Sequence, residues 1–531
     1  MSASFTEPAR TGPARTGPAR TGPVPVTAID AGPGGVVERV AGPRLPAPGD
    51  LADRLSATGA EVWTDPESRA EAGRDWWPLA VGWAARGAVA ARPAVVVRPT
   101  SVAQVSAVLA LCSAARVPVT PAGGRSGVCG GAVPLLGGVA LDLTGLAGVR
   151  AVDETSLVAD VAAGTFGPDL EAALAEVGPG YTVGHRPQSV DISTVGGWLA
   201  CRGAGQYSNR YGKIEDMVVG LEVVLADGRV VRTDGRAPRS ATGPNLTQLF
   251  VGSEGTLGVI TEARLRIHPH PGGHGRRAYG FADFAAGLEA CRRMTRRGAT
   301  PAVLRLYDAV ESERNFDRGD TCVLIVLDEA DPALVEATLG LVDQECARDP
   351  ATEVLDPALV ERWLGHRNDV SALAPLWRGD IVVDTAEVAA SWRALPGLSE
   401  RVLAALARVP GTLVASVHQS HAYPDGACLY FTFAGQDPEG RTDGPLLGPA
   451  MAWQEAYYRQ AWDTVTEVTM DQGGAISHHH GIGLNRGRFL AEALGPAFSV
   501  LSAVKAALDP VGIMNPGKLG LASPLGEPSW P

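Results

Sequence analysis

"PAGGRSGVCGG", residues 121–131, places five glycines in eleven residues directly after a predicted strand. Glycines at this density let consecutive backbone N–H groups converge on one point, because no Cβ atom obstructs them. Such a loop favours an anion, and a phosphate or diphosphate is the natural ligand. The spacing matches neither G-x-G-x-x-G, which marks many dinucleotide sites, nor the G-x-x-x-x-G-K-[ST] phosphate loop. A flexible surface loop is the alternative interpretation.

The segments around this loop alternate between strand and helix patterns. "AVVVRP" (94–99) is a short β-branched strand, and "SVAQVSAVLALCSAARV" (101–117) is an amphipathic helix that leads towards the loop. Farther on, "GPDLEAALAEVG" (167–178) predicts a helix and "DMVVGLEVVLADGRVVRT" (216–233) predicts strands. These patterns predict an α+β domain over roughly residues 90–270.

A second α+β unit follows the first. "AVLRLYD" (302–308), "GTLVASVHQS" (411–420) and "ACLYFTFAG" (427–435) alternate as antiparallel strands do. "FADFAAGLEACRRMTRRG" (281–298) predicts a helix before the first of these strands. We expect one antiparallel sheet with helices on one face.

The N-terminal part of the chain has a different character. "ARTGPARTGPARTGP" (9–23) repeats five residues three times and contains no apolar residue larger than alanine. Such a segment cannot bury enough apolar surface to offset the entropy lost on ordering, so residues 1–45 are predicted to be disordered. The following segment, up to about residue 90, is predicted to be helical.

Composition and charge exclude several classes of protein. A net charge of −12 argues against electrostatic binding to nucleic acid or to an anionic membrane. The sequence has no run of about 18 apolar residues, so no transmembrane segment is expected, and the N-terminus lacks a signal-peptide pattern. Seven scattered cysteines without C-x-x-C spacing predict reduced thiols and a cytoplasmic location.

Five further strings carry a family resemblance. They are "STVGGW" (193–198), "YGKIED" (211–216), "FVGSEGTLGVITEA" (250–263), "GACLYF" (426–431) and "SHHHGIG" (477–483). With the glycine loop, they make the chain resemble the vanillyl-alcohol oxidase / p-cresol methylhydroxylase (PCMH-type) flavoproteins from about Pro93 to Gly520. Within that family the chain most resembles the alkyldihydroxyacetonephosphate synthases.

The resemblance implies a fold and a domain organisation. The expected fold class is α+β, with a two-subdomain PCMH-type FAD-binding domain and a cap domain built on an antiparallel sheet. The expected segments are a disordered N-terminus (1–45), a helical extension (46–90), the FAD-binding domain (91–271), the cap or substrate domain (272–470), a C-terminal segment that returns to the flavin site (471–520) and a tail (521–531).

The resemblance also implies which residues bind FAD. The backbone of the glycine loop would hold the diphosphate, hydroxyl and amide groups near residue 190 would line the ribityl and ring region, and two residues of "GSEGTLGVI" would lie near the adenine. The predicted cofactor residues are Pro121, Ala122, Gly123, Gly124, Arg125, Ser126, Gly127, Gln188, Ser189, Thr194, Gly196, Gly197, Glu254 and Ile260. Members with covalent flavin often carry histidine in the loop; Arg125 stands here, so we expect dissociable FAD.

The run His478, His479 and His480 admits three interpretations. In an extended chain neighbouring side chains alternate, so His478 and His480 would share a face and His479 would point away. A metal site would need a supporting carboxylate at workable spacing, and no H-E-x-x-H string occurs; a structural pair of buried histidines is a second possibility. We favour proton transfer beside the flavin, because imidazole both gives and takes protons near neutral pH. No metal is predicted.

Two cap residues complete the predicted catalytic set. Arg305 lies on a strand between Leu304 and Leu306 and faces away from them, where a guanidinium suits a carboxylate or phosphate. Tyr430, on the strand of "GACLYF", matches a substrate-binding phenol of the family. A surface arginine and a core tyrosine are the alternatives.

The sequence also departs from the synthases. His418 and His421 stand where the synthases lack histidine, and neither Arg367 nor Arg378 falls at the position of their second arginine. We therefore expect an FAD-dependent enzyme acting at the flavin N5 on a small hydroxy or keto substrate with an anionic group. A true synthase, which exchanges an acyl for an alkyl chain, and a 2-hydroxyacid oxidase or dehydrogenase remain alternatives, as do a homodimer and a non-catalytic flavin-binding protein.

Overall fold

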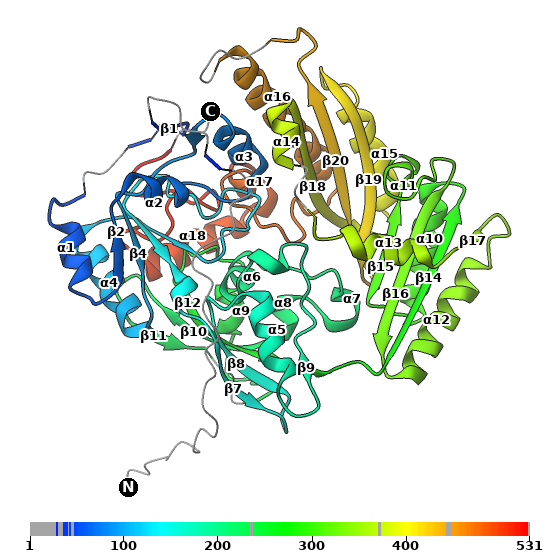
Figure 1. The fold of residues 1–531 in the computed structure, drawn as a ribbon, viewed down its shortest axis with the longest axis horizontal. Coiled ribbons are helices and arrows are strands. Elements are labelled where there is room, and N and C mark those ends of the chain that lie inside the picture. The colour runs from blue at the N-terminus through cyan, green and yellow to red at the C-terminus, as the bar shows by residue number, and fades with distance from the viewer. Residues whose placement is uncertain are drawn as a thin grey trace.

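The computed structural model describes residues 28–29, 35–40, 42–43, 47–233, 235, 237–369, 373–441 and 448–528. The predicted disordered N-terminus and its repeat fall largely outside the described residues. The chain forms two lobes, one at the left and one at the right of Figure 1, and the C-terminal helices return to the first lobe.

The first lobe contains two sheets. In the smaller sheet the strand order is β2-β4-β6-β5; β4, β6 and β5 are parallel, and β2 is antiparallel to β4. Its strands are β2 (Glu61–Trp63), β4 (Val95–Arg98), β6 (Val139–Asp142) and β5 (Val119–Ala122). The larger sheet is antiparallel, in the order β11-β10-β12-β8-β7. Its strands are β11 (Val230–Arg232), β10 (Val218–Val224), β12 (Val259–Arg266), β8 (Val158–Ala162) and β7 (Val149–Asp153).

Helices of the first lobe form where the apolar periodicity predicts them. Helix α4 (Val102–Ala115) begins where the Ser101 side chain accepts a hydrogen bond from the Gln104 amide, and it buries Val105, Val108, Leu109 and Cys112 against the smaller sheet. Beside the larger sheet lie four helices and short strands. They are α5 (Gly167–Ala175), α6 (Val195–Cys201), α8 (Ile214–Met217) and α9 (Leu246–Phe250), with the strand pair β9 (Tyr181–Thr182) and β13 (His268–Pro269).

The segment predicted to be a helical extension contains strands as well. Its helices are α1 (Leu51–Ser56), α2 (Pro66–Glu71) and α3 (Pro78–Ala84), and the parallel pair β1 (Val37–Glu38) and β3 (Ala88–Val89) flanks them. Strand β2 also lies here, because Val62 pairs with Val97 and extends the smaller sheet. Trp77 and Trp83 are fully buried and donate hydrogen bonds to Tyr458 and Glu455 of the second lobe.

The second lobe is built on one seven-stranded antiparallel sheet in the order β17-β14-β16-β15-β19-β20-β18. Its strands are β17 (Glu353–Leu355), β14 (Gly273–Phe281), β16 (Cys322–Ala330), β15 (Val303–Tyr307), β19 (Thr412–Ala422), β20 (Gly426–Gln436) and β18 (Ile381–Ser391).

The two faces of this sheet are covered differently. Leu304, Leu429 and Phe431 point into the main apolar core, which four long helices and the short α14 close. These are α10 (Phe284–Arg296), α12 (Pro332–Cys346), α15 (Leu395–Leu406), α16 (Pro449–Asp471) and α14 (Leu373–Arg378). On the other face lie the shorter α11 (Ala309–Phe316), α13 (Ala358–His366) and α7 (Ser208–Tyr211) of the first lobe. Helix α7 packs against β15 and β19 and so joins this second face to the first lobe.

The C-terminal segment ties the glycine loop down. After α17 (Gly487–Leu494) and α18 (Ala497–Leu508), Met514 forms a parallel bridge with Val119. The Asn515 amide then donates to the backbone carbonyls of Gly131 and Glu254, at 3.0 and 2.7 Å. The C-terminal segment therefore holds the glycine loop (121–131) in place.

Within the described residues, no single helix is long and apolar enough to cross a membrane, although the sharply bent pair α17–α18 meets that criterion jointly. All seven cysteines lie in the described part and are free thiols, as their spacing predicts.

Candidate active site

A cavity of about 310 Å³ lies between the two lobes. Every predicted cofactor residue lines it, and so do four of the five predicted catalytic residues: Arg305, Tyr430, His479 and His480. His478 does not. The fold thus brings together segments that are separated by more than 300 residues in the sequence.

The glycine loop is packed tightly against the turn before helix α6. A Cβ atom at Gly123 would collide with the Thr194 hydroxyl, and one at Gly124 would collide with the carbonyl of Ile192. Thr194 is also the N-cap of α6, where its hydroxyl accepts a hydrogen bond from the Gly197 amide at 3.4 Å. The loop is therefore a fixed part of the cavity wall and not a loose surface segment.

Two buried polar side chains on the cavity wall lack partners within the described structure. The Nε and Nη2 atoms of Arg125 have none, and burial lowers the pKa of this guanidinium. Both ring nitrogens of His185 lack a partner too; the imidazole packs on Trp198 and burial lowers its pKa to about 3. Buried donors without partners are costly, so both groups suit a polar ligand that completes their hydrogen bonds.

On the second lobe, Arg305 is held by a chain of polar groups. Its Nη2 lies 2.5 Å from Nε2 of His418, whose Nδ1 lies 2.7 Å from the Glu311 carboxylate. Burial and the neighbouring Arg305 together lower the pKa of His418 to about 4. Burial alone would raise the pKa of Glu311, but His418 and the other donors bring it down to about 2. His418 is therefore neutral, donates Nδ1–H to Glu311 and accepts from Arg305.

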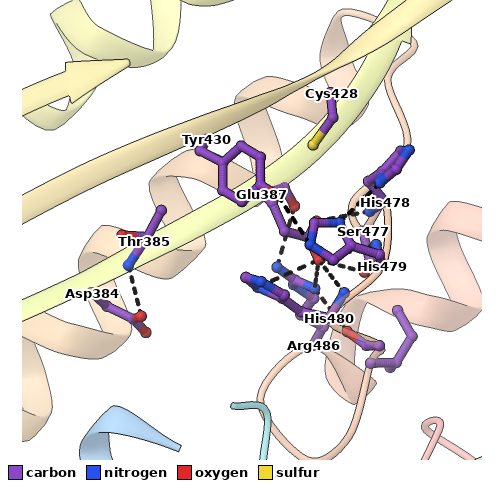
Figure 2. A network of polar contacts seen from close by, with 12 residues as sticks. Asp384, Thr385, Glu387, Cys428, Tyr430, Ser477, His478, His479, His480 and Arg486 are labelled. Atoms are coloured by element: carbon purple, nitrogen blue, oxygen red, sulfur yellow. Dashed lines mark hydrogen bonds and ion pairs between the residues drawn. The ribbon is translucent and has the colours of Figure 1, made fainter. Parts of the chain in front are cut away.

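The histidine loop is held by a carboxylate from strand β18. Glu387 is fully buried and accepts the backbone amides of His478, His479 and His480 at 2.7, 3.3 and 2.6 Å, as well as the Ser477 hydroxyl (Figure 2). Burial opposes ionisation of this group, yet Arg486 and the loop keep the pKa of Glu387 well below its usual value.

The other end of the loop is held from the first lobe. The Glu254 carboxylate accepts the amides of Ile482 and Gly483 at 2.6 and 2.8 Å. The family resemblance placed Glu254 near the adenine. The residue does line the cavity, but its carboxylate is directed to the histidine loop.

The three histidines do not alternate as an extended strand would. Residues 478–480 form a bend in which all three amides turn towards Glu387, so His479 and His480 line the cavity and His478 lies behind them. The prediction that His478 and His480 share a face, with His479 pointing away, is therefore wrong. Burial lowers the pKa of His478 and of His480 to about 4, and that of His479 further, so all three are neutral at pH 7.

Tyr430 connects the histidine loop to a histidine of its own sheet. Its hydroxyl lies 3.1 Å from Nε2 of His479 and 2.9 Å from Nε2 of His421, which is buried with a φ of 51°. Burial raises the pKa of Tyr430 well above the usual value. A phenol between two neutral imidazoles can pass a proton to either one.

One nitrogen from each of His421, His478 and His479 lies within 4.8 Å of the others, so a metal ion could fit among them. No metal is predicted from the sequence at this position. Both ring nitrogens of His421 and of His478 make hydrogen bonds in this structure.

Several residues of the site were not predicted from the sequence. Glu387 gives a weak signal, a carboxylate inside an otherwise apolar strand, whereas Glu311 and Tyr423 look like ordinary helix and turn residues. His185 was missed as well. Of the two arginines left open, Arg367 lies over Tyr207 and donates to Gln206 beside the cavity, while Arg378 lies at the end of α14 and does not line it.

Comparisons with known proteins agree with this architecture. The family model described as FAD binding domain matches residues 93–234, and the model FAD linked oxidases, C-terminal domain matches residues 277–519. A solved alkyldihydroxyacetonephosphate synthase superposes with a TM-score of 0.73 at 24% identity, over 90% of this chain and 89% of that one. A p-cresol methylhydroxylase superposes with a TM-score of 0.70 at 17% identity, over 91% and 99%. The fold and cavity define a PCMH-type flavin-binding protein.

Three curated relatives extend the likeness to sequence. The uncharacterized FAD-linked oxidoreductase YgcU of Escherichia coli (strain K12) is 32% identical over 429 residues, covering 78% of this chain and 86% of that protein. Glycolate oxidase subunit GlcD of Bacillus subtilis (strain 168) is 30% identical over 430 residues, with coverage of 78% and 86%. The alkyldihydroxyacetonephosphate synthase of Dictyostelium discoideum is 29% identical over 454 residues, with coverage of 78% and 71%. The chain belongs to the FAD-linked oxidoreductase family, and FAD is its cofactor.

The cavity fits this cofactor. The tight glycine loop offers backbone amides to a diphosphate, and the partnerless guanidinium of Arg125 supplies a positive charge on the same wall. The predicted family, α+β fold class and cofactor are confirmed. The roles of individual residues remain proposals.

Proposed function

We propose that this protein oxidises a small hydroxy substrate that carries an anionic group, with FAD as the electron acceptor. The observation that carries the proposal is that Tyr430, His421, His479 and Arg305 line the same cavity as the glycine loop. When bound, FAD supplies a ring that accepts a hydride. The protein must then bind the anion, orient the carbon–hydrogen bond and remove the hydroxyl proton.

Tyr430 and its imidazole neighbours suit the proton transfer. The substrate hydroxyl gives its proton to the Tyr430 oxygen while the phenol passes its own proton to His479 or His421. The imidazoles are neutral, so each has one unprotonated ring nitrogen that can accept a proton. Forming a phenolate is unfavourable because burial raises the pKa of Tyr430, which favours a concerted exchange.

Arg305 suits the anionic group of the substrate. Its side chain is partly buried, its Nε has no partner in the described structure, and its Nη2 lies 2.5 Å from Nε2 of His418. A guanidinium in this state can donate to a carboxylate or phosphate oxygen without first losing a protein partner. Glycolate, named for the Bacillus subtilis relative, is the simplest substrate of this class.

A second candidate is the redox-neutral exchange of an acyl for an alkyl chain, as in an alkyldihydroxyacetonephosphate synthase. The sequence identity to such enzymes favours it. Against it stand His418 and His421, which lie in contact with Arg305 and Tyr430 at positions where the resemblance to the synthases fails. We therefore place oxidation first.

Anaerobic stopped-flow absorbance of the FAD-loaded protein separates the two candidates. Glycolate, D-lactate, L-lactate and glycerol 3-phosphate are mixed in turn with the enzyme, and lasting loss of the visible flavin band is the expected result for at least one. Exchange of palmitoyl dihydroxyacetone phosphate with hexadecanol, without lasting bleaching, would establish the synthase instead. Loss of the reaction in His479→Ala and Tyr430→Phe is expected; unchanged rates in both would refute the catalytic roles proposed here.

A further inference from the structure

Tyr430 stands at one end of two hydrogen-bonded arms that lead away from the cavity. The first arm runs through the histidine loop. His479 uses Nε2 towards Tyr430 and Nδ1 towards Nδ1 of His478, at 3.1 and 2.9 Å. His478 then uses its remaining nitrogen, Nε2, towards the Tyr423 hydroxyl at 2.8 Å. Both imidazoles are engaged at both ring nitrogens, which is the arrangement needed to take a proton on one side and release one on the other.

The second arm runs through strand β19 and helix α7. Nε2 of His421 lies 2.9 Å from the Tyr430 hydroxyl, and its Nδ1 lies 2.7 Å from the Ser208 hydroxyl. The Ser208 hydroxyl lies close enough to the Tyr423 phenol to affect its pKa. The two arms therefore converge at Tyr423, and the six groups form a ring, called the circuit below.

The circuit is balanced in donors and acceptors. Each neutral imidazole and each hydroxyl can give one proton and accept one, so the five hydrogen bonds of the two arms are all satisfied when the groups donate in the same rotational sense. An imidazolium in the circuit would have two donors and no acceptor, and would break this balance. The lowered pKa values of His421, His478 and His479 agree with a neutral circuit.

The members of the circuit lie in two different surroundings. His421, Tyr430 and His479 line the cavity, whereas Ser208, His478 and Tyr423 do not. Tyr423 lies in the turn after β19, beneath Lys213, whose Nζ is 4.8 Å from the centre of the phenol ring. Lys213 pairs with Asp216, whose side chain is half exposed. Tyr423 is thus the member of the circuit next to a charged pair at the surface.

We propose that this circuit carries the substrate proton from Tyr430 to the protein surface, and that Tyr423 is the point where it leaves. The inference rests on the proposed oxidation. As the Tyr430 oxygen accepts the substrate proton, one proton moves along each link of one arm from Tyr430 to Tyr423, and the Tyr423 hydroxyl releases one to solvent. No group in the circuit carries a charge after the transfer, and proton number is conserved. Tyr423 never touches substrate; it acts through the other members.

The circuit makes a structural prediction that needs no substrate. In the link between His478 and His479, one Nδ1 donates and the other accepts, so the two neutral rings must be opposite tautomers, one protonated at Nδ1 and the other at Nε2. The chain has 10 histidines, so ¹⁵N-histidine labelling of the FAD-loaded protein gives a small NMR spectrum. Tyr423→Phe should move the ring signals of His478 and of His479, whereas Tyr457→Phe, on the far side of the sheet, should move neither.

Kinetics test the transport role. Tyr423→Phe interrupts both arms, so the rate of flavin bleaching by glycolate, or by whichever hydroxy acid of the panel reduces wild type, should fall about tenfold or more. Ser208→Ala interrupts one arm only and should have a smaller effect, and Tyr457→Phe should match wild type. In Tyr423→Phe the solvent deuterium isotope effect should rise, and added imidazole buffer should restore the rate by carrying the proton instead.

Failure of the circuit is distinguishable from failure of the proposed function. If no hydroxy acid bleaches the wild-type flavin but the tautomers are opposite and respond to Tyr423→Phe, the oxidation is refuted and the circuit stands. If bleaching occurs but Tyr423→Phe behaves as Tyr457→Phe in rate, isotope effect and buffer response, the circuit is refuted. One equivalent of bound transition metal, whose removal by a chelator shifts the signals of His421, His478 and His479, would also overturn it.

Discussion

The Glu387 carboxylate and the Arg486 guanidinium form an ion pair of 3.0 Å between Oε1 and Nη1, and neither residue is exposed to solvent. Arg486 also donates to the carbonyls of Gly481 and Glu387, and its guanidinium lies over the ring of Trp462. The pair locks the histidine loop between strand β18 and helices α16 and α17. An ion pair this deep is costly to separate, because the partner left behind keeps its charge in the interior.

Replacing Glu387 should therefore affect both stability and the site. Glu387→Gln leaves Arg486 without a counter-ion, and we expect a loss of about 3–5 kcal/mol in the free energy of unfolding. Urea unfolding monitored by tryptophan fluorescence measures it. Glu439→Gln, at an exposed position, is the matched control and should be neutral within about 0.5 kcal/mol. A loss below about 1 kcal/mol in Glu387→Gln would contradict the role of the pair as the anchor of the loop.

Arg125 should contribute to FAD affinity. Its buried guanidinium has two donor atoms without partners, so a diphosphate can gain charge-assisted hydrogen bonds from it. Arg125→Leu should weaken FAD binding about 10- to 100-fold, as expected for one or two such bonds. Fluorescence titration of the flavin-free protein gives the dissociation constant. The exposed Arg150→Leu should leave it unchanged, and equal constants for both variants would exclude the contact.

FAD should be held without a covalent bond. The family position that often bears a linking histidine is Arg125 in this chain, and a guanidinium does not form such a bond. After acid precipitation the flavin is expected in the supernatant, measured by its absorbance. Flavin fluorescence that stays with the denatured chain on a gel would contradict this, and repetition with His185→Phe would show whether the partnerless imidazole of the cavity forms the link.

Arg305 should discriminate substrates by charge. Arg305→Lys keeps a positive charge but loses the planar donor pair and the contact with His418, so KM for an anionic hydroxy acid should rise about 10- to 100-fold. An uncharged analogue such as the corresponding amide should lose much less. Steady-state kinetics with both compounds check the difference. Equal losses for acid and amide would show that Arg305 supports the fold and does not bind the anion.

Acid should destabilise the folded protein through His418. His418 is 6% exposed, and burial lowers its pKa from 6.5 to about 4. Between pH 6.5 and 4 this residue therefore binds a proton in the unfolded chain but not in the folded chain. As a result, the free energy of unfolding falls as the pH falls from 6.5 towards 4. The slope is about 1.4 kcal/mol per pH unit for one such group. Urea unfolding between pH 7 and 4 should show a shallower slope in His418→Gln than in Tyr457→Phe.

The sequence was sufficient for the parts of the site whose residues are close together in the chain. The glycine loop, the Thr194 turn and the histidine run each form a local string, and alternation along "VLRLYD" was enough to turn Arg305 away from Leu304. Glu387 and Glu311 could not be assigned in this way, because their partners lie 91 and 107 residues away. Only the pairing of β15, β19, β20 and β18 in one sheet brings each carboxylate close to its partners.

The bend at residues 478–480 was not predicted from the sequence, for a similar reason. Taken alone, three histidines in a row follow the alternation of an extended chain. A distant carboxylate that collects three consecutive amides overrides that preference, and nothing within the run itself indicates its presence.

The loop that carries the histidines is fastened at its two ends to different lobes, to Glu387 on one side and to Glu254 on the other. The loop therefore connects the two lobes across the cavity, and the lobes can separate at this point only if the hydrogen bonds to one of the two carboxylates break. Both carboxylates accept hydrogen bonds from main-chain amides, so replacing a side chain of the loop does not remove these hydrogen bonds. Evolution could therefore exchange the histidines for new chemistry while the two halves stayed in register.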